Sequence, residues 1–265
     1  MNPSGVDESI DFVEYDPQWA ATSPTEVLLS GGNLTAGVVR VGDTVRRPRK
    51  ASSAFVARLL RHLEAHGFAG APRYLGEDEQ DRDTLSYLPG EVPSRFRRFA
   101  DHQLADFGRL LRAFHDATRG SDLCDGFPVV CHHDPGPNNV VFDGEHPTAL
   151  IDFDFAASGD PLEDVAYAAW VWCISSRSDR QPASDQSRQT RLLADSYGLT
   201  AAERALLIDA ILERHDRNEQ FWTARQLDPT RATTSPERIA ELLTWTANER
   251  AFVQAHRAEF EAALR

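Results

Sequence analysis

The sequence predicts an α+β protein of two lobes, a small antiparallel β-rich lobe with one helix followed by a larger, mainly helical lobe. Three observations predict this. Short apolar runs separated by turn residues fill the first third of the chain, amphipathic helical patterns fill most of the rest, and Pro89 and Pro93 interrupt the pattern between them. We therefore expect a flexible polar arm at 1–25, a small lobe with its connector at 26–90, and a helical lobe at 91–265.

The small lobe is predicted to contain five strands and one helix. The segment 25–48 indicates three short strands joined by glycine-containing turns, which form an antiparallel meander. Residues 51–67 carry apolar side chains at helical spacing and end on Gly67, a residue type that often stops helices. The segments 73–76 and 84–88 indicate two further strands separated by an acidic turn.

The large lobe begins with a strong amphipathic helical pattern at 101–120. Short strands follow at 129–155, around a polar loop and the turn Asp143-Gly144. Asp160 before Pro161 is typical of an N-cap followed by a proline in the first helical turn. Beyond about residue 185 the pattern predicts three or four more helices.

Charge and cysteine content limit the classes of partner. The net charge of −13 should repel nucleic acid and anionic membranes, and it tolerates cationic ligands, although simple solubility explains it better than a steering role. We expect no nucleic-acid and no membrane partner. Cys124, Cys131 and Cys173 form no CxxC pair, which indicates reduced thiols in a cytoplasmic protein. Lys50 is the only lysine, so chemistry that normally needs a lysine must use it or an arginine.

The polar loop lies between two valine-rich runs, in the segment VVCHHDPGPNNVVF at 129–142. Asp134 and Asn139 lie in this loop, and Asp152 follows thirteen positions after Asn139. Strands paired through the Asp143-Gly144 turn would bring Asp152 back beside Asn139. Carboxylate and amide oxygens suit Mg²⁺, and a further carboxylate can accept the proton of an attacking hydroxyl. This spacing predicts a site for metal-assisted chemistry.

The same residues carry a family resemblance. The pattern His132-x-Asp134-x-x-x-x-Asn139, followed by Ile151-Asp152-Phe153-Asp154, resembles the catalytic and metal-binding motifs of the aminoglycoside phosphotransferase and choline kinase-like family, relatives of the protein kinases. The order of predicted elements is similar over nearly the whole chain. The resemblance implies a protein kinase-like fold and phosphoryl transfer from ATP or GTP.

The resemblance also implies a role for individual residues. Asp134 would be the catalytic base, and Asn139 and Asp152 would hold Mg²⁺. His132 would support the loop, and Asp164 would be the family's structural aspartate at the start of the next helix. Asp154 is either a second acidic contact to the metal or a hydrogen-bonded residue at a strand end.

Two other interpretations of the loop remain. Asp134, Asn139 and Asp152 are residue types that also favour turns and caps. Cys131, His132 and His133 are potential ligands of a transition metal, although three consecutive residues converge poorly on one tetrahedral ion.

The small lobe departs from the family pattern. Gly31, Gly32 and Asn33 lie between strands, where the backbone could approach phosphates or form a plain turn. The family has a phosphate-binding lysine on the third strand. Arg46 best fits that position here, whereas Lys50 lies past Pro48. The helix glutamate that normally pairs with the lysine is also missing, because the matching part of the helix, 54–56, is apolar.

The connector and the acceptor site are less well defined. The stretch LSYLPGEVP resembles the family's adenine-binding connector, in which the backbone of Ser86 and Leu88 would pair with the base. Aromatic residues near acids in the helical lobe could hold a cationic amine, although most of them suit the core equally well. The candidates are Trp170, Trp172, Phe221, Trp222, Trp245, Glu219 and Glu249.

The sequence thus favours ATP- or GTP-dependent phosphoryl transfer, with Mg²⁺, to a hydroxyl of a small molecule such as an aminoglycoside, an amino alcohol or a sugar. A catalytically weak or inactive nucleotide-binding protein of an immunity type is the main alternative, because the lysine–glutamate pair is missing. Metal-dependent hydrolysis is a third.

Overall fold

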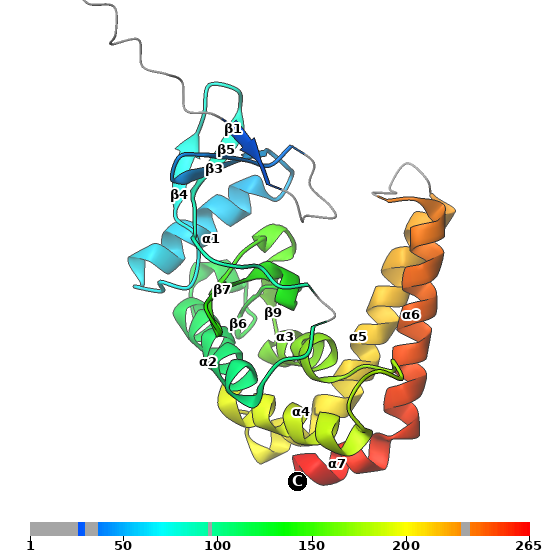
Figure 1. The fold of residues 1–265 in the computed structure, drawn as a ribbon. Coiled ribbons are helices and arrows are strands. Elements are labelled where there is room, and N and C mark those ends of the chain that lie inside the picture. Colours follow the sequence, from blue (N-terminus) through cyan, green and yellow to red (C-terminus); the bar gives the residue numbers. More distant parts are fainter. Residues whose placement is uncertain (1–25, 30–36, 95–96, 229–233) are drawn as a thin grey trace, which may run out of the picture.

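The computed structural model describes residues 26–29, 37–94, 97–228 and 234–265. It has an N-terminal antiparallel sheet with one helix, followed by a mainly helical region, which confirms the predicted fold class (Figure 1). The arm expected at 1–25 lies outside the described residues. In the part that is described, no helix is both long and apolar enough to cross a membrane.

The small lobe consists of the sheet and helix α1. Its strands pair antiparallel in the order β1-β2-β3-β5-β4. Their bounds are β1 (Glu26–Leu28), β2 (Val39–Val41), β3 (Thr44–Pro48), β4 (Tyr74–Glu77) and β5 (Arg82–Ser86). Helix α1 (Ser53–Ala65) buries Val56, Leu59, Leu60 and Leu63, which lie on one face at helical spacing. It therefore packs with this apolar face toward the core.

The large lobe contains six α-helices among its described residues. They are α2 (Asp101–Thr118), α3 (Pro161–Ala168), α4 (Ala183–Tyr197), α5 (Ala201–Leu227), α6 (Pro236–Ala255) and α7 (Arg257–Leu264). A five-residue π-helix, η5 (Ala169–Cys173), continues α3. Helices α5 and α6 pack side by side and form a long arm that projects from the rest of the lobe (Figure 1). The four helices α4 to α7 agree with the helical pattern expected after residue 185.

Two small two-stranded antiparallel sheets lie in the middle of the large lobe. Strand β6 (Val129–Cys131) pairs with β9 (Ala157–Gly159), and β7 (Val140–Asp143) pairs with β8 (His146–Leu150). Short 3-10 turns cover Asp122–Cys124, Pro137–Asn139 and Phe153–Phe155. The polar loop thus connects β6 and β7, which belong to different sheets.

Aromatic packing joins α2 to these small sheets and to η5. Phe107 and Phe114 on α2 are fully buried, and the ring of Phe107 stacks on Trp172 with centroids 4.1 Å apart. Phe142 on β7 stacks against the same indole at 6.2 Å. Burying such large rings contributes much of the stabilisation of a core. This core lies directly beneath the polar loop.

The connector between the lobes is held on β7. The backbone N–H groups of Glu91 and Phe142 donate to each other's carbonyl oxygens at 3.0 and 2.8 Å. Gly90 precedes this bridge with φ +145°, and a Cβ atom there would lie 2.3 Å from the carbonyl oxygen of Phe142. Only glycine fits such a close approach. The connector is therefore attached to the strand that begins just after Asn139.

Candidate active site

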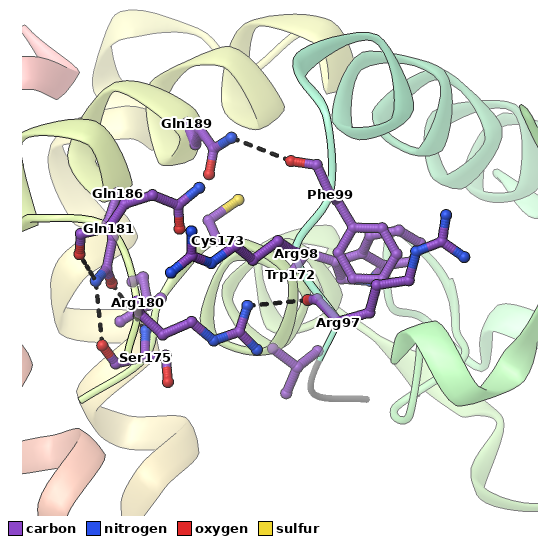
Figure 2. A pocket seen from close by; sticks show the side chains of 12 residues that line it. Arg97, Arg98, Phe99, Trp172, Cys173, Ser175, Arg180, Gln181, Gln186 and Gln189 are labelled. Carbon is purple, nitrogen blue, oxygen red and sulfur yellow. Dashed lines mark hydrogen bonds between the residues drawn. The ribbon is translucent and has the colours of Figure 1, made fainter. Parts of the chain in front are cut away.

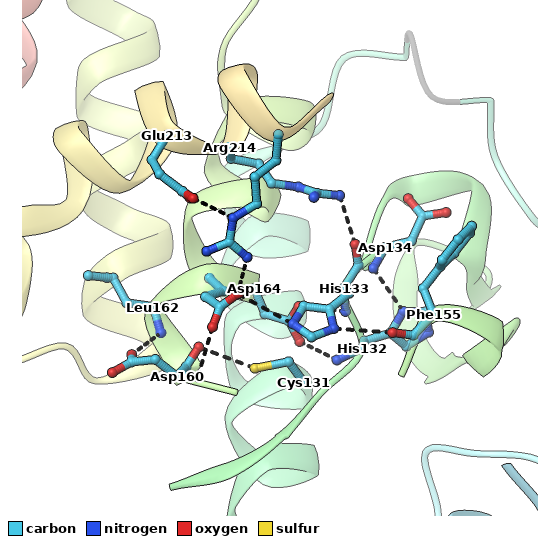
Figure 3. Close-up of polar contacts among 12 residues, drawn as sticks. Cys131, His132, His133, Asp134, Phe155, Asp160, Leu162, Asp164, Glu213 and Arg214 are labelled. Atoms are coloured by element: carbon cyan, nitrogen blue, oxygen red, sulfur yellow. Dashed lines mark hydrogen bonds and ion pairs between the residues drawn. The ribbon is translucent and has the colours of Figure 1, made fainter. Parts of the chain in front are cut away.

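The buried carboxylate of Asp164 fixes the start of the polar loop (Figure 3). Its two oxygens accept the backbone N–H groups of His132 at 2.6 Å and His133 at 2.7 Å, and the ring of His115 lies 3.0 Å from Oδ2. Burial alone would disfavour the charge, but the hydrogen bond from His115 and the nearby histidines hold the pKa of Asp164 below its ordinary value. Asp164 is at the start of α3, so this helix anchors the loop.

The ring of His132 supports the loop from inside. It is fully buried, and its Nε2 lies 3.0 Å from the carbonyl oxygen of Ile151. Its Nδ1 accepts the backbone N–H of Asp134 at 3.3 Å. One ring nitrogen therefore donates and the other accepts, which fits a neutral imidazole. His132 links the residue before Asp152 to Asp134.

His133 turns the chain so that Asp134 projects outward. Its backbone lies in the left-handed region at φ +61°, and its carbonyl oxygen accepts a 2.9 Å hydrogen bond from Arg214 on α5. The guanidinium of Arg214 also lies over the ring of Tyr167, 4.4 Å from its centroid. The long arm of the large lobe thus contacts the loop directly (Figure 3).

Both oxygens of the Asp134 carboxylate are held by side chains. Oδ1 accepts the hydroxyl of Tyr167 at 2.6 Å, and Oδ2 accepts Nδ2 of Asn139 at 2.9 Å. The same Nδ2 also donates to the carbonyl oxygen of Asp134 at 2.9 Å. The amide nitrogen of Asn139 therefore faces Asp134, and its amide oxygen faces the other way, where it accepts Nδ2 of Asn138 at 3.1 Å.

The β7–β8 hairpin places Asp152 next to Asn139. Val140 pairs with Leu150, and the backbone N–H of Ile151 donates to the carbonyl oxygen of Asn139 at 2.9 Å. Asp152 has a left-handed backbone with φ +62°. Burial and the neighbouring Asp154 raise the pKa of Asp152. Its side chain remains 38% exposed, so solvent and ligands can reach it.

Two cations from the small lobe meet these acids. The guanidinium of Arg47 on β3 pairs with Asp154 and lies 3.9 Å from the Asp152 carboxylate, and Nζ of Lys50 lies 2.5 Å from Oδ2 of Asp154. Although burial opposes the charge of Asp154, Arg47 and Lys50 hold its pKa below the ordinary value. Arg46 instead donates to the hydroxyl of Thr84. Neighbouring strand residues point to opposite faces, so the structure brings Arg47, and not Arg46, to the acids.

Arg47 also lies close to a buried carboxylate of the small lobe. Asp83 on β5 is only 3% exposed, lies 4.0 Å from Nε of Arg47, and accepts the hydroxyl of Ser53 at the start of α1. The sequence predicted no glutamate on the helix, and the strand supplies this carboxylate instead. Sequence reasoning placed Arg47 only behind Arg46, together with Lys50, and it missed Asp83, Tyr167 and Arg214.

The other residues expected to contact the nucleotide lie in the glycine turn of the small lobe and in the connector. Gly31, Gly32 and Asn33 lie outside the described residues. The backbone N–H of Ser86 donates to the carbonyl oxygen of Arg73 at 2.9 Å, and Leu88 lies half-buried in the connector. The adenine contact of Ser86 and Leu88 stays a prediction.

The aromatic residues considered for the acceptor are mainly core residues. Trp170 and Trp172 are buried, and the indole N–H of Trp172 donates to the carbonyl oxygen of Pro135 at 2.9 Å. Trp245 stacks on Trp170 with centroids 4.7 Å apart. Glu249 is buried and accepts the backbone N–H and hydroxyl of Ser176. Phe221 contacts Phe155 edge-on, with centroids 6.1 Å apart.

The three consecutive residues considered as transition-metal ligands point to different partners. The thiol of Cys131 donates to the carbonyl oxygen of Asp160, and Nδ1 of His133 contacts that of Phe155. Among the described residues, one group of potential ligand atoms lies within 4.8 Å, namely His115, Cys131 and Asp164. Their hydrogen bonds to the loop and to each other give this group a structural role, and burial raises the pKa of the Cys131 thiol.

Comparisons with known proteins test the family resemblance. A sequence model of the phosphotransferase enzyme family matches residues 23–125 and 121–179. The chain is 33% identical to the trifolitoxin immunity protein of Rhizobium leguminosarum bv. trifolii, over 90% of this chain and 98% of that protein.

Solved structures share the fold at low sequence identity. A choline/ethanolamine kinase family protein from Mesorhizobium loti superposes with a TM-score of 0.61 at 16% identity, covering 95% of this chain and 96% of that one. A spectinomycin phosphotransferase in complex with ADP and spectinomycin superposes with a TM-score of 0.62 at 12% identity, covering 88% and 93%. With the family match over more than half of its length, this chain belongs to the phosphotransferase enzyme family.

Proposed function

We propose that the protein transfers a phosphoryl group from ATP or GTP to a hydroxyl of a small molecule. The observation that carries this proposal is the position of Asp134, whose carboxylate is held by Tyr167 and Asn139 beside the Asp152 hairpin. A carboxylate fixed in this way can orient an acceptor hydroxyl and take its proton. Family membership and the nucleotide seen in a related structure support the same reaction class.

The oxygen ligands fit Mg²⁺. Asn139 uses its amide nitrogen for Asp134 and presents its oxygen, and the Asp152 carboxylate is accessible. These two residues would hold the ion, as in sites that combine few protein oxygens with phosphates and water. When bound, Mg²⁺ would neutralise negative charge on the phosphates. Asp154 would remain paired with the small lobe.

Arg47 and Lys50 would bind the nucleotide phosphates. They lie on the small-lobe side of the acids, where they pair with Asp154. Asp83 positions Arg47 from behind. Arginine forms forked hydrogen bonds to phosphate oxygens, and lysine supplies a compact charge. Phosphates placed between these cations and Asp134 would meet an acceptor hydroxyl at the loop.

An acceptor screen with labelled nucleotide and mass spectrometry of the products tests this proposal. Wild type should phosphorylate at least one hydroxyl compound, and Asp134→Asn should not. Mg-nucleotide binding by the variant, measured by calorimetry, is the control for folding. Transfer at the wild-type rate by Asp134→Asn would contradict the role of Asp134.

A second candidate is an immunity-type protein that binds nucleotide without transferring phosphate. The 33% identity to the trifolitoxin immunity protein over nearly its full length supports it, as does the absence of the family's lysine from the third strand. Saturable Mg-nucleotide binding without turnover on any acceptor would favour this candidate.

A further inference from the structure

A small recess opens where the chain entering α2 passes η5 and the start of α4 (Figure 2). Its enclosed part has a volume of only about 10 Å³, room for about one water molecule, so a larger group would bind at its open mouth. Its lining includes Arg98, Phe99, Trp172, Ser175, Arg180 and Gln186. Arg98 and Arg180 extend into the recess, whereas the side chain of Arg97 turns away from it (Figure 2). We call this site the arginine recess.

The arginine recess lies next to the catalytic loop. Trp172 forms part of its wall and donates its indole N–H to the carbonyl oxygen of Pro135, the residue after Asp134. On its other side, Ser176 follows the lining residue Ser175 and is bound by Glu249 of α6. A ligand in this recess would therefore lie between the loop and the α5–α6 arm, within the large lobe and away from Arg47 and Lys50.

The charge of the recess is positive. Arg98 donates to the backbone carbonyl oxygen of Asp179, and Arg180 donates to that of Arg97 at 3.1 Å. The carboxylate of Asp179 is itself held by Arg177, through two contacts of 3.1 Å. Within the described part of the chain, Arg98 has no carboxylate within 4.0 Å, although the chain has 41 acidic residues and only 28 basic ones.

The electrostatics of Arg180 agree with an excess of positive charge. Burial, together with repulsion from Arg177 and Arg98, lowers the pKa of Arg180 despite the neighbouring carboxylates of Asp179 and Glu249. A bound anion would relieve this repulsion. Two guanidinium groups in one recess match the paired oxygens of a carboxylate or phosphate, to which arginine forms forked, charge-assisted hydrogen bonds.

We propose that the arginine recess binds an anionic group of the phosphoryl acceptor, so that the acceptor is a hydroxyl compound that also carries a carboxylate or a phosphate. This inference rests on the proposed phosphoryl transfer. It differs from the cationic acceptor that the net charge allows. With a net charge of −13 on the whole chain, attraction to such an acceptor must be local, and Arg98 and Arg180 supply it.

Calorimetric titration of four small probes into the full chain tests the proposal. Glycolate carries a hydroxyl and a carboxylate, glycerol phosphate carries hydroxyls and a phosphate, glycolamide is the neutral match of glycolate, and choline is a cationic alcohol. Saturating Mg-ADP blocks the nucleotide site throughout. We expect at least one anionic probe to bind more tightly than glycolamide and choline, and the tighter of the two identifies the anion.

Arg98→Gln should weaken binding of that anion by about tenfold or more, since it removes a charge-assisted contact. Arg109→Gln is the matched control, because it makes the same charge change on the exposed face of α2, where Arg109 pairs with Asp106. The proposal would be overturned if the anionic probe bound Arg98→Gln and Arg109→Gln with equal affinity. It would also be overturned if choline or glycolamide bound more tightly than both anionic probes, or if neither anionic probe bound. Anion binding in this titration, together with no phosphorylated product in the acceptor screen, would contradict the proposed function instead.

Discussion

The hydroxyl of Tyr167 donates a 2.6 Å hydrogen bond to Oδ1 of Asp134. Tyr167 is buried on α3, one turn after Asp164, so the same helix fixes both the backbone of the loop and the carboxylate that projects from it. Arg214 covers the ring of Tyr167 and also binds the loop at His133. The orientation of Asp134 is therefore set by α3 and α5 together.

Tyr167→Phe should lower kcat by roughly tenfold or more, because a hydrogen bond to a charged group is typically worth about 1.5–3 kcal/mol. Affinity for Mg-nucleotide should not change. Steady-state kinetics and calorimetry separate the two effects. In an Asp134→Asn background the same substitution should have no further effect on residual transfer, because the two residues act as one unit. A fully additive loss would assign Tyr167 a merely structural role.

Asp134→Asn should reduce transfer by about 10²–10⁴-fold, the usual contribution of a positioned base. Nucleotide binding should persist, because the Asp134 carboxylate accepts hydrogen bonds from Tyr167 and Asn139, whereas Arg47 and Lys50 pair with Asp154. Product formation measured by mass spectrometry checks the loss, and the thermal shift with Mg-ATP checks that the site is intact.

Asp152→Asn should abolish the Mg²⁺-dependent stabilisation by ATP and yet raise the melting temperature of the free protein. Burial and Asp154 raise the pKa of Asp152 in the folded state above its unfolded value. Its contribution to stability is then fully present below the unfolded pKa and is lost as the pH rises through the folded one. In thermal scans, the melting temperature of the variant should therefore exceed that of wild type by more at neutral pH than at acidic pH. A difference in melting temperature that does not change with pH would contradict this explanation.

Lys50→Gln should weaken Mg-ATP binding, and Arg46→Gln should leave it unchanged. Lys50 lies at the acids beside Arg47, whereas Arg46 bonds to Thr84 on the other face of β3. Calorimetry with ATP compares the two variants, which make the same charge change in the same lobe. Arg47→Gln should also destabilise the free protein, because it removes one of the cations that neutralise the buried carboxylates of Asp83 and Asp154. Weaker binding by Arg46→Gln alone would return the phosphate role to Arg46.

His215→Phe should make the protein more resistant to acid. His215 is fully buried against Trp170, and neither ring nitrogen has a hydrogen-bond partner among the described residues. Burial, Arg250 and Arg214 lower the pKa of His215 to about 3. The unfolded state therefore binds a proton that the folded state does not, and stability falls as the pH drops below about 6.5. Denaturant titrations between neutral and mildly acidic pH should show a shallower loss for the variant.

The hairpin around Asp143-Gly144 shows what local sequence signals can predict. The turn residues are Gly144 and Glu145 rather than the predicted Asp143 and Gly144, and a bulge at Val141 and Phe142 shifts the register by one residue. The hairpin signal therefore predicted that Asn139 and Asp152 approach each other, but not the register in which their strands pair. The fold followed similarly from the change between strand and helix periodicity. The predicted end of the first helix near Gly67 also agrees with the structure, in which this glycine follows helix α1 with φ +72°.

Strand β3 shows a feature that local sequence signals could not predict. Arg46 and Arg47 are adjacent, and a shift of one residue reverses which of them faces the acids. The register is set by pairing of Arg46 with Thr84 and of Arg47 with Asp83, a contact between distant segments that no local pattern encodes. Tyr167 could have been found, because it lies one helical turn after Asp164. The cations of the arginine recess come from segments about 80 residues apart and could not.

The contact between Lys50 and Asp154 has a practical consequence. Because the chain contains a single lysine, an amine-directed acylating reagent can modify only one side chain, and that side chain lies at the junction of the two lobes. Modification there removes the positive charge and detaches one small-lobe cation from Asp154. The extent of acylation of one residue would then report, in a mass spectrum, how firmly the small lobe closes on the large one.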